Sequence, residues 1–159
     1  DRMTMTQFTS TDETNKWTTF ANDDLAPIVY PNICRSLSES YAAFGYVDDV
    51  QSFSMTQKLL VKNVGALAMY LAASRIKAKR NITDEREALH KALSQWEVDG
   101  LHGGTQTFSS GLSHPNMGDI AMFGTLVSVQ GLEAHVDAVV NRGGVIHGWY
   151  ERMHDEVGR

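Results

Sequence analysis

The sequence is poor in cysteine and proline, and each scarcity narrows the possible classes of protein. Cys34 is the single cysteine among 159 residues, so an intrachain disulfide is excluded and the fold needs no oxidising compartment. With only 3 prolines and 42% hydrophobic residues, the composition is that of an ordinary globular protein and not of a proline-rich disordered chain. A length of 159 residues predicts one domain with a sizeable core.

Long apolar runs and an excess of positive charge are also missing. The longest nearly uncharged apolar stretch, residues 64–73, is shorter than the ~20 residues that cross a bilayer, which predicts no transmembrane segment and still allows peripheral association. The net charge of −5 argues against nucleic-acid binding, because phosphates repel an acidic surface. No signal-peptide pattern is visible, and a start at Asp1 instead of Met leads us to expect a processed or excised chain.

Convincing strand alternation is absent, whereas apolar residues recur at three- and four-residue steps, as they do on one face of a helix. Residues 1–13, rich in Thr, Ser and Met, predict an extended or disordered arm, and residues 14–159 form the domain. Helices are expected from Thr14, bent at Pro27 and ended by Pro31, then after the Ser36-x-x-Glu39 capping box, and further at 54–79, 83–98, 117–130, 134–140 and 147–157. Six or seven helices without a sheet indicate an all-α helical bundle.

The segment 54–79 has the longest helical pattern, and one side of it consists of Gly65 and several alanines. Small side chains let another helix approach closely, so we expect this helix to be the central one. Its end carries a basic cluster: Arg75, Lys77, Lys79 and Arg80. Cations are favourable at a helix C-terminus, and a solvated helix end is the simpler interpretation. A contact with phosphates or with an acidic partner is the alternative.

The most specific local signal is Pro115-Asn116-Met-Gly-Asp119 before an apolar helical run. Asn116 can accept hydrogen bonds from the first free N–H groups of the helix, and Asp119 can accept one from the Asn116 N–H. Asp119 also lies at the positive end of the helix dipole. We therefore assign both residues a capping, structural role instead of a catalytic one.

Few other residues are candidates for chemistry. Cys34 follows Pro31 and adjoins Arg35; a helix N-terminus and a cation would lower the pKa of its thiol, although a buried packing role is the preferred interpretation. Tyr70 lies among small residues and is expected in the core or an interface. His147 and His154, the closest helical histidine pair, are seven apart instead of the three or four of a metal site, so no metal is expected.

The helix order and the late Asn-x-x-Asp cap resemble the C-terminal domain of the glutathione transferase superfamily. Specific segments are similar to the membrane-associated prostaglandin E synthase type 2 family: Phe20-Ala-Asn-Asp-Asp24, residues 36–44, Val64-Gly-Ala-Leu-Ala-Met-Tyr-Leu71, Pro115-Asn-Met-Gly-Asp-Ile-Ala121, Gly131-Leu132 and Trp149-Tyr-Glu-Arg152. The resemblance implies a two-part enzyme. A thioredoxin-like domain with Cys-x-x-Cys binds glutathione, and the helical domain closes the substrate pocket. Such proteins isomerise prostaglandin H2 to E2 or bind haem with glutathione, and they are attached to membranes or found in mitochondria.

The chain departs from this family where the chemistry would lie. It has no Cys-x-x-Cys, and the family's haem-contacting His and Ser align with Pro27 and Tyr30. One hypothesis is therefore a non-catalytic helical module, an accessory or scaffolding subunit of a mitochondrial membrane-associated complex, with protein partners or a second copy and without cofactors. The location would otherwise be cytoplasmic.

The alternative hypothesis is the C-terminal part of a glutathione-dependent prostaglandin E synthase, an isomerase whose thioredoxin-like domain is absent from this chain. Pro27, Tyr30, Cys34 and Tyr70 would then approach its pocket, and glutathione or haem would bind there.

Overall fold

The computed structural model describes residues 12–158, and within them it contains helices, turns and loops but no strand. The elements are α1 (Asp12–Phe20), a π-helical turn (Ala21–Leu25), α2 (Ala26–Ile33), α3 (Leu37–Ala43), a 3-10 turn (Gly45–Asp49), α4 (Met55–Arg80), α5 (Glu85–Gln95), a π-turn (Trp96–Gly100), a 3-10 turn (His102–Gly104), α6 (Met117–Val127), α7 (Glu133–His135), a π-turn (Val136–Asn141) and α8 (Gly144–Val157). The all-α class is confirmed. With α1 and α2 counted as one interrupted helix, this part of the chain holds seven helices.

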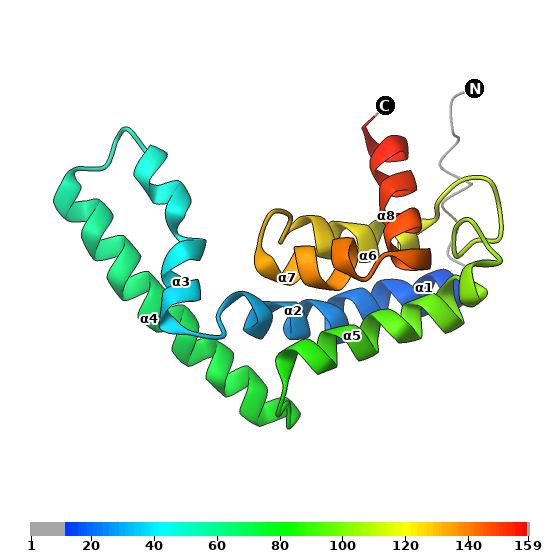
Figure 1. The fold of residues 1–159 in the computed structure, drawn as a ribbon, viewed down its shortest axis with the longest axis horizontal. Helices are drawn as coiled ribbons and strands as arrows, with labels where there is room; N and C mark the ends of the chain where they lie inside the picture. Colours follow the sequence, from blue (N-terminus) through cyan, green and yellow to red (C-terminus); the bar gives the residue numbers. More distant parts are fainter. Residues whose placement is uncertain (1–11, 159) are drawn as a thin grey trace.

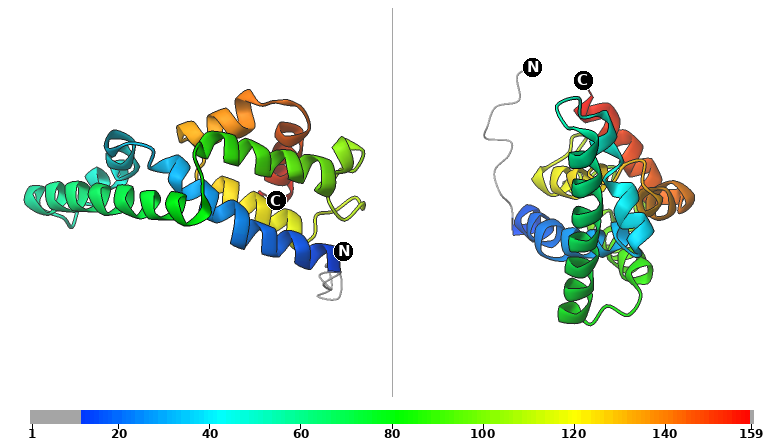
Figure 2. Two further views of the ribbon diagram at one scale, coloured as in Figure 1. Left: turned by 90° about the horizontal axis from the view of Figure 1, so that it is seen from below. Right: turned by 90° about the vertical axis from the view of Figure 1, so that its left-hand side faces the viewer.

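The helices form a body and an arm (Figure 1). The body consists of α1, α2, α5, α6, α7 and α8, and the α3–α4 hairpin projects away from it at one end. Seen from two further directions, α4 extends well beyond the body (Figure 2). The expectation that this helix is the central one is therefore wrong: its only buried residues are Ala66 and Ala73.

The core of the body is built on three fully buried tryptophans from three helices. Trp96 lies between Trp17 and Trp149, with ring centroids 4.9 and 5.3 Å away in edge-to-face geometry. Gly118 lets α1 approach α6 closely, since a Cβ there would lie 2.9 Å from the Trp17 Cβ. Leucine, valine and methionine side chains of α2, α5, α6 and α8 fill the space around the rings, and this burial is the main source of stability.

The first helix begins at Asp12, two residues before the predicted start, and the expectation for residues 1–11 lies outside the described part of the chain. Its predicted bend is present as the π-turn just before Pro27, where Ala26 N–H bonds to the Ala21 carbonyl. Proline has no N–H and its ring crowds the carbonyl four residues earlier, which is that of Asp23. Arg80 donates to this carbonyl instead, so the last turn of α4 is tied to the bend.

Pro31 does not end the helix, contrary to expectation. It lies inside α2, and the chain leaves the helix at Cys34. The last turn is held by the amide of Asn32, whose Nδ2 donates to the Ile28 carbonyl at 2.9 Å and to the Glu85 carbonyl at 2.6 Å. A tertiary contact to the start of α5 thus extends the helix past a residue that local rules treat as a stop.

Candidate functional site

Two hollows flank the end of α2, and they separate the residues predicted to share a pocket. The first is a groove of about 410 Å³ between α2 and α6, lined by Tyr30 together with Ala26, Val29, Ile120 and Gly124. The second is a hollow of about 180 Å³ between the end of α2 and α4, and it brings Cys34 and Tyr70 together with Arg35 and Lys77. Pro27 lines neither of these two hollows.

Cys34 lies at the C-terminal end of α2, not at the N-terminus of a helix. Its side chain is 2% exposed. Burial raises the pKa of the thiol, the hydrogen bond with Ser40 lowers it, and the carboxylate of Glu39 raises it again. The less favoured expectation of a lowered pKa is therefore wrong, because desolvation outweighs the hydrogen bond with Ser40. The preferred interpretation of Cys34 as a buried packing residue is confirmed.

Tyr30 lies one turn before Cys34 on α2. Burial raises the pKa of its hydroxyl, and the charge of Cys34 raises it further. A phenol with a raised pKa remains protonated at neutral pH. The raised pKa values therefore activate neither the Cys34 thiol as a nucleophile nor the Tyr30 hydroxyl as a base.

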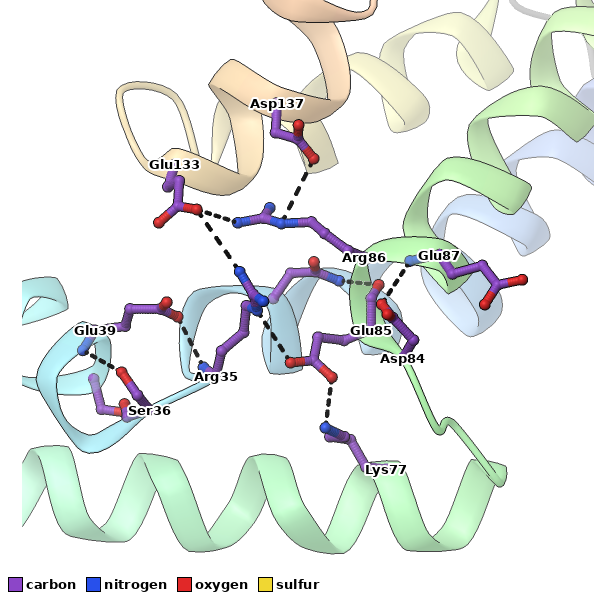
Figure 3. A network of polar contacts seen from close by, with 12 residues as sticks. Arg35, Ser36, Glu39, Lys77, Asp84, Glu85, Arg86, Glu87, Glu133 and Asp137 are labelled. Atoms are coloured by element: carbon purple, nitrogen blue, oxygen red, sulfur yellow. Dashed lines mark hydrogen bonds and ion pairs between the residues drawn. The ribbon is translucent and has the colours of Figure 1, made fainter.

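Glu85, at the start of α5, is the centre of an ion-pair network that connects the arm to the body (Figure 3). Arg35 Nε lies 3.2 Å from one oxygen of its carboxylate, and Lys77 Nζ lies 2.5 Å from the other. Burial opposes ionisation of Glu85, but the bonds from Lys77, from its own backbone N–H and from Arg35 prevail and lower its pKa. A paired, buried carboxylate of this kind holds the α2–α3 turn and the end of α4 in place.

The network continues across the body through Arg86. Its guanidinium lies 3.5 Å from Glu133 and 3.6 Å from Asp137, and Asp137 lies 3.0 Å from His90 Nε2. Sequence reasoning missed this network. The sequence did carry a signal for it: the basic last turn of α4 is followed directly by the acidic first turn of α5.

The basic cluster divides into two pairs. Lys77 and Arg80 are bound within the chain, to Glu85 and to Asp23 and Asp24. Arg75 and Lys79 are exposed on α4. Only these two cations of the cluster are therefore free to meet a partner without breaking a contact seen here, and contact with a partner stays a prediction.

The capping box at Asn116 and Asp119 is present, and it is part of a larger hub. Asn116 Oδ1 accepts from the N–H groups of Gly118 and Asp119 at 2.7 and 3.1 Å, and Asp119 accepts from the Asn116 N–H at 3.1 Å. Asp119 is fully buried and also accepts from Ser109 N–H, Ser109 Oγ and Trp149 Nε1 at 3.1, 2.8 and 3.0 Å. No local pattern points to Ser109 or Trp149, which come from a loop and from α8.

Two histidines lie against Tyr150 at the interface of α6, α7 and α8. The rings of His135 and His154 lie 4.9 and 5.5 Å from that of Tyr150. Burial lowers the pKa of His135, and the charges of His147 and His154 lower it further, opposed by Glu151. Among residues 12–158, no group of three potential ligands is arranged to hold a metal ion.

The surface of the arm carries an unusual number of large apolar side chains. Leu37, Tyr46, Met55, Leu59, Leu60, Val64, Leu67 and Leu71 are each about half exposed or more. By length and composition alone, α4 is also long and apolar enough to cross a membrane, with 11% of its most apolar window buried. The helical periodicity of α4 predicts the helix itself, but periodicity alone does not show which side of a helix the rest of the chain covers.

The chain is 34% identical over 142 residues to prostaglandin E synthase 2 of Mus musculus, and 33% identical over 139 residues to prostaglandin E synthase 2 of Danio rerio. These alignments cover 89% and 87% of the chain but only 36% of each relative, so the chain spans about a third of their length. No protein-family model matches the chain. The resemblance to prostaglandin E synthase 2 that the sequence motifs suggested is thus confirmed for nearly all of the chain, and the helical fold is consistent with the C-terminal domain of the glutathione transferases.

Proposed function

We propose that the chain acts as a non-catalytic helical interaction module derived from a prostaglandin E synthase 2-like protein. Its role would be that of an accessory or scaffolding subunit in a mitochondrial, membrane-associated complex. The observation that carries the proposal is the projecting α3–α4 hairpin, whose large apolar side chains are exposed. Exposed apolar surface of this extent is typical of protein or membrane contacts.

The chemistry around α2 supports the same proposal. The single thiol is buried with a raised pKa, whereas a catalytic thiol needs exposure and a lowered pKa. The hollow that Cys34 shares with Tyr70 is about 180 Å³, smaller than the ~300–1,000 Å³ of typical ligand pockets. The mitochondrial location rests on the resemblance to the family.

One observation favours the alternative, in which the chain contributes to a glutathione-dependent prostaglandin H2 to E2 isomerase. The α2–α6 groove of about 410 Å³ falls within the size range of ligand pockets, and Tyr30 lines it. In that case the reactive thiol and the glutathione site, or a haem, would come from the remainder of a longer protein.

Two measurements test the proposal. The purified chain, supplied with glutathione and prostaglandin H2, should form prostaglandin E2 no faster than the uncatalysed reaction, and clear turnover would overturn the non-catalytic role. On native gels of gently solubilised mitochondria, the chain should migrate in an assembly much larger than two copies of itself. Migration only as a monomer or a dimer would overturn the scaffolding role.

A further inference from the structure

A third hollow lies where the end of α2, the helix α3 and the start of α7 meet. Its volume is about 160 Å³, and its polar lining consists of Asn32, Glu39 and Glu133. The rest of the lining is aliphatic, chiefly Ile33 and Leu132. Apolar walls with a few polar groups are typical of binding sites. Since most ligand pockets measure ~300–1,000 Å³, this hollow has the size for a single side chain.

Asn32 contributes an acceptor that has no donor. Its side chain is 2% exposed, and its Nδ2 donates to the carbonyls of Ile28 and Glu85 at 2.9 and 2.6 Å. These two bonds identify the nitrogen end of the amide, because only an N–H group can donate to a carbonyl. Oδ1 is buried and accepts no hydrogen bond from the described residues. A buried acceptor of this kind is uncommon and costly, and it favours the approach of a donor.

Each of the two carboxylates also has one oxygen without a partner among residues 12–158. Glu39, on α3, accepts from the Arg35 N–H through Oε2 at 3.1 Å. Glu133, at the start of α7, lies 3.7 Å from Arg35 and 3.5 Å from Arg86, in both cases through Oε1. Figure 3 shows both carboxylates and these contacts. Glu39 Oε1 and Glu133 Oε2 are therefore open to a ligand.

The lining of the hollow is negatively charged. It contains two carboxylates and no basic side chain. The two arginines that contact Glu133 are each paired with a further carboxylate: Arg35 Nε lies 3.2 Å from Glu85, and Arg86 Nε lies 3.6 Å from Asp137. Their charges are thus largely offset outside the hollow, and a positive group that enters it is attracted.

The arrangement of the acceptors favours an ammonium group over other cations. Three open oxygens come from three different elements, and an ammonium group has three N–H donors. A guanidinium group prefers two oxygens of one carboxylate in its own plane. A calcium ion takes six to eight oxygen ligands and gains nothing from aliphatic walls. The methylene stem of a lysine side chain, in contrast, packs against such walls while its charged end stays among polar groups.

We propose that this hollow binds the ammonium group of a lysine side chain from a partner protein, with Asn32 Oδ1, Glu39 and Glu133 as its three acceptors. Oδ1 is covered by its neighbours, so entry of the ammonium group includes a small local shift of the lining. The inference rests on the proposed function and deepens it, since it names the chemical group that the interaction module recognises.

NMR titration of the ¹⁵N-labelled chain tests the recognition, with Nα-acetyl-lysine methylamide as the probe. We expect saturable shifts confined to residues 32–43 and 132–134, with a Kd of about 1–10 mM for a single side chain. Nα-acetyl-norleucine methylamide, which has the same stem without the ammonium group, should bind at least about tenfold more weakly. Equal binding of both probes, tighter binding of the arginine analogue, or no saturable shift up to about 50 mM would overturn the proposal.

Glutamine substitutions test the acceptors. Glu39→Gln combined with Glu133→Gln keeps the shape of the hollow but removes its charge, and it should weaken lysine-probe binding at least about tenfold. Glu87→Gln combined with Asp155→Asn is the matched control, since both residues are exposed outside the hollow and the net charge changes equally. Well-dispersed spectra show that the variants fold. Equal weakening by the two double variants would mean that overall charge, and not this site, attracts the probe.

Zero-length crosslinking identifies the source of the ammonium group. A carbodiimide joins a carboxylate to an amine in contact with it as an amide, with loss of water. In gently solubilised mitochondria, mass spectrometry should find Glu39 or Glu133 joined to a lysine of a different polypeptide. Amides with ethanolamine lipids or other small amines, joining only to lysines of this chain's own sequence, or no crosslink at either carboxylate would overturn the protein partner.

Failure of this inference and failure of the proposed function are distinguishable. A chain that resides in a large native assembly but does not bind the lysine probe contradicts only the ammonium site. A chain that binds the lysine probe but also isomerises prostaglandin H2 contradicts only the non-catalytic role.

Discussion

Trp149 donates its indole N–H to Asp119 Oδ1 across 3.0 Å, and this bond joins α8 to the cap of α6. The Asp119 carboxylate is fully buried, and among the described residues no cation contacts it. Four N–H or O–H groups from three segments donate hydrogen bonds to it instead. Such a group is stabilising only as long as its donors are all in place.

Asp119→Ala should therefore cost more than the 0.5–2 kcal/mol of an ordinary helix cap. It leaves buried donors of Ser109, Asn116 and Trp149 without an acceptor, and we expect a loss of at least about 3 kcal/mol in the free energy of unfolding. Urea denaturation measures it. Ser109→Ala removes only one hydroxyl donor and should cost about 0.5–1.5 kcal/mol. Equal small losses for both variants would contradict the hub.

The cap itself was predictable because it is local. Asn116, Asp119 and the apolar run after them lie within a few residues, and the same holds for Ser36, whose Oγ accepts from Glu39 N–H at 3.1 Å. The second half of that box is absent, since Glu39 accepts from the N–H of Arg35 instead. Sequence rules thus identified these two helix starts, but in the second of them a neighbouring donor decided which bond forms.

The role of α4 was not predictable in the same way. Gly65 and the alanines showed that something could approach this helix closely, but not that a short hairpin partner would do so while the leucines remained outside. The packing role preferred for Cys34 is confirmed, but the expectation of a lowered thiol pKa failed for a related reason. Its sequence neighbours suggested an activated thiol, whereas burial, which depends on the whole fold, sets the direction of its pKa shift.

Cys34 offers a direct check of that conclusion. In the native chain at pH 8, its reaction with a disulfide reagent should be slower than in denaturant by about 100-fold or more, because the thiol is buried and must wait for local opening. Ser74→Cys, an exposed position lining the same hollow, should react freely. A native Cys34 that reacts as fast as the Ser74→Cys thiol would show an accessible nucleophile and would favour the isomerase alternative.

Glu85→Gln should loosen the arm. The change removes the charge that binds Arg35 and Lys77, and at neutral pH we expect a loss of roughly 1–3 kcal/mol, as for hydrogen bonds to a charged group. Because the folded state lowers the pKa of Glu85, its contribution is present above the ordinary carboxyl pKa and is lost as pH falls through the folded value. The difference between variant and unmodified chain, from urea titrations, should therefore shrink in acid.

Glu87→Gln is the control for this effect. Glu87 is on the same helix and exposed, so its loss should leave stability nearly unchanged at every pH. Faster hydrogen exchange confined to the end of α4 and the start of α5 in Glu85→Gln would identify the arm as the part that opens. Exchange that rises only in the tryptophan core would contradict the network's role in holding the hairpin.

His135 should make the chain less stable in mild acid. Its pKa is lowered in the folded state, so below the ordinary histidine value of about 6.5 the unfolded chain binds a proton that the folded chain resists. Stability is then full above that pH and falls as pH decreases toward the folded pKa. His135→Gln, which cannot be protonated, should reduce this slope between about pH 6.5 and 5 in thermal or urea unfolding.

Substitution of a charged neighbour of His135 provides a second test of this prediction. Both His147 and His154 contribute positive charge against its protonation, and Glu151 opposes them. His154→Gln should therefore bring the pKa of His135 part of the way back toward its ordinary value, which NMR titration of the His135 ring would report. Should that ring titrate normally in the unmodified chain, burial between α7 and α8 would not control the charge, and the mild-acid instability would have to come from the carboxylates.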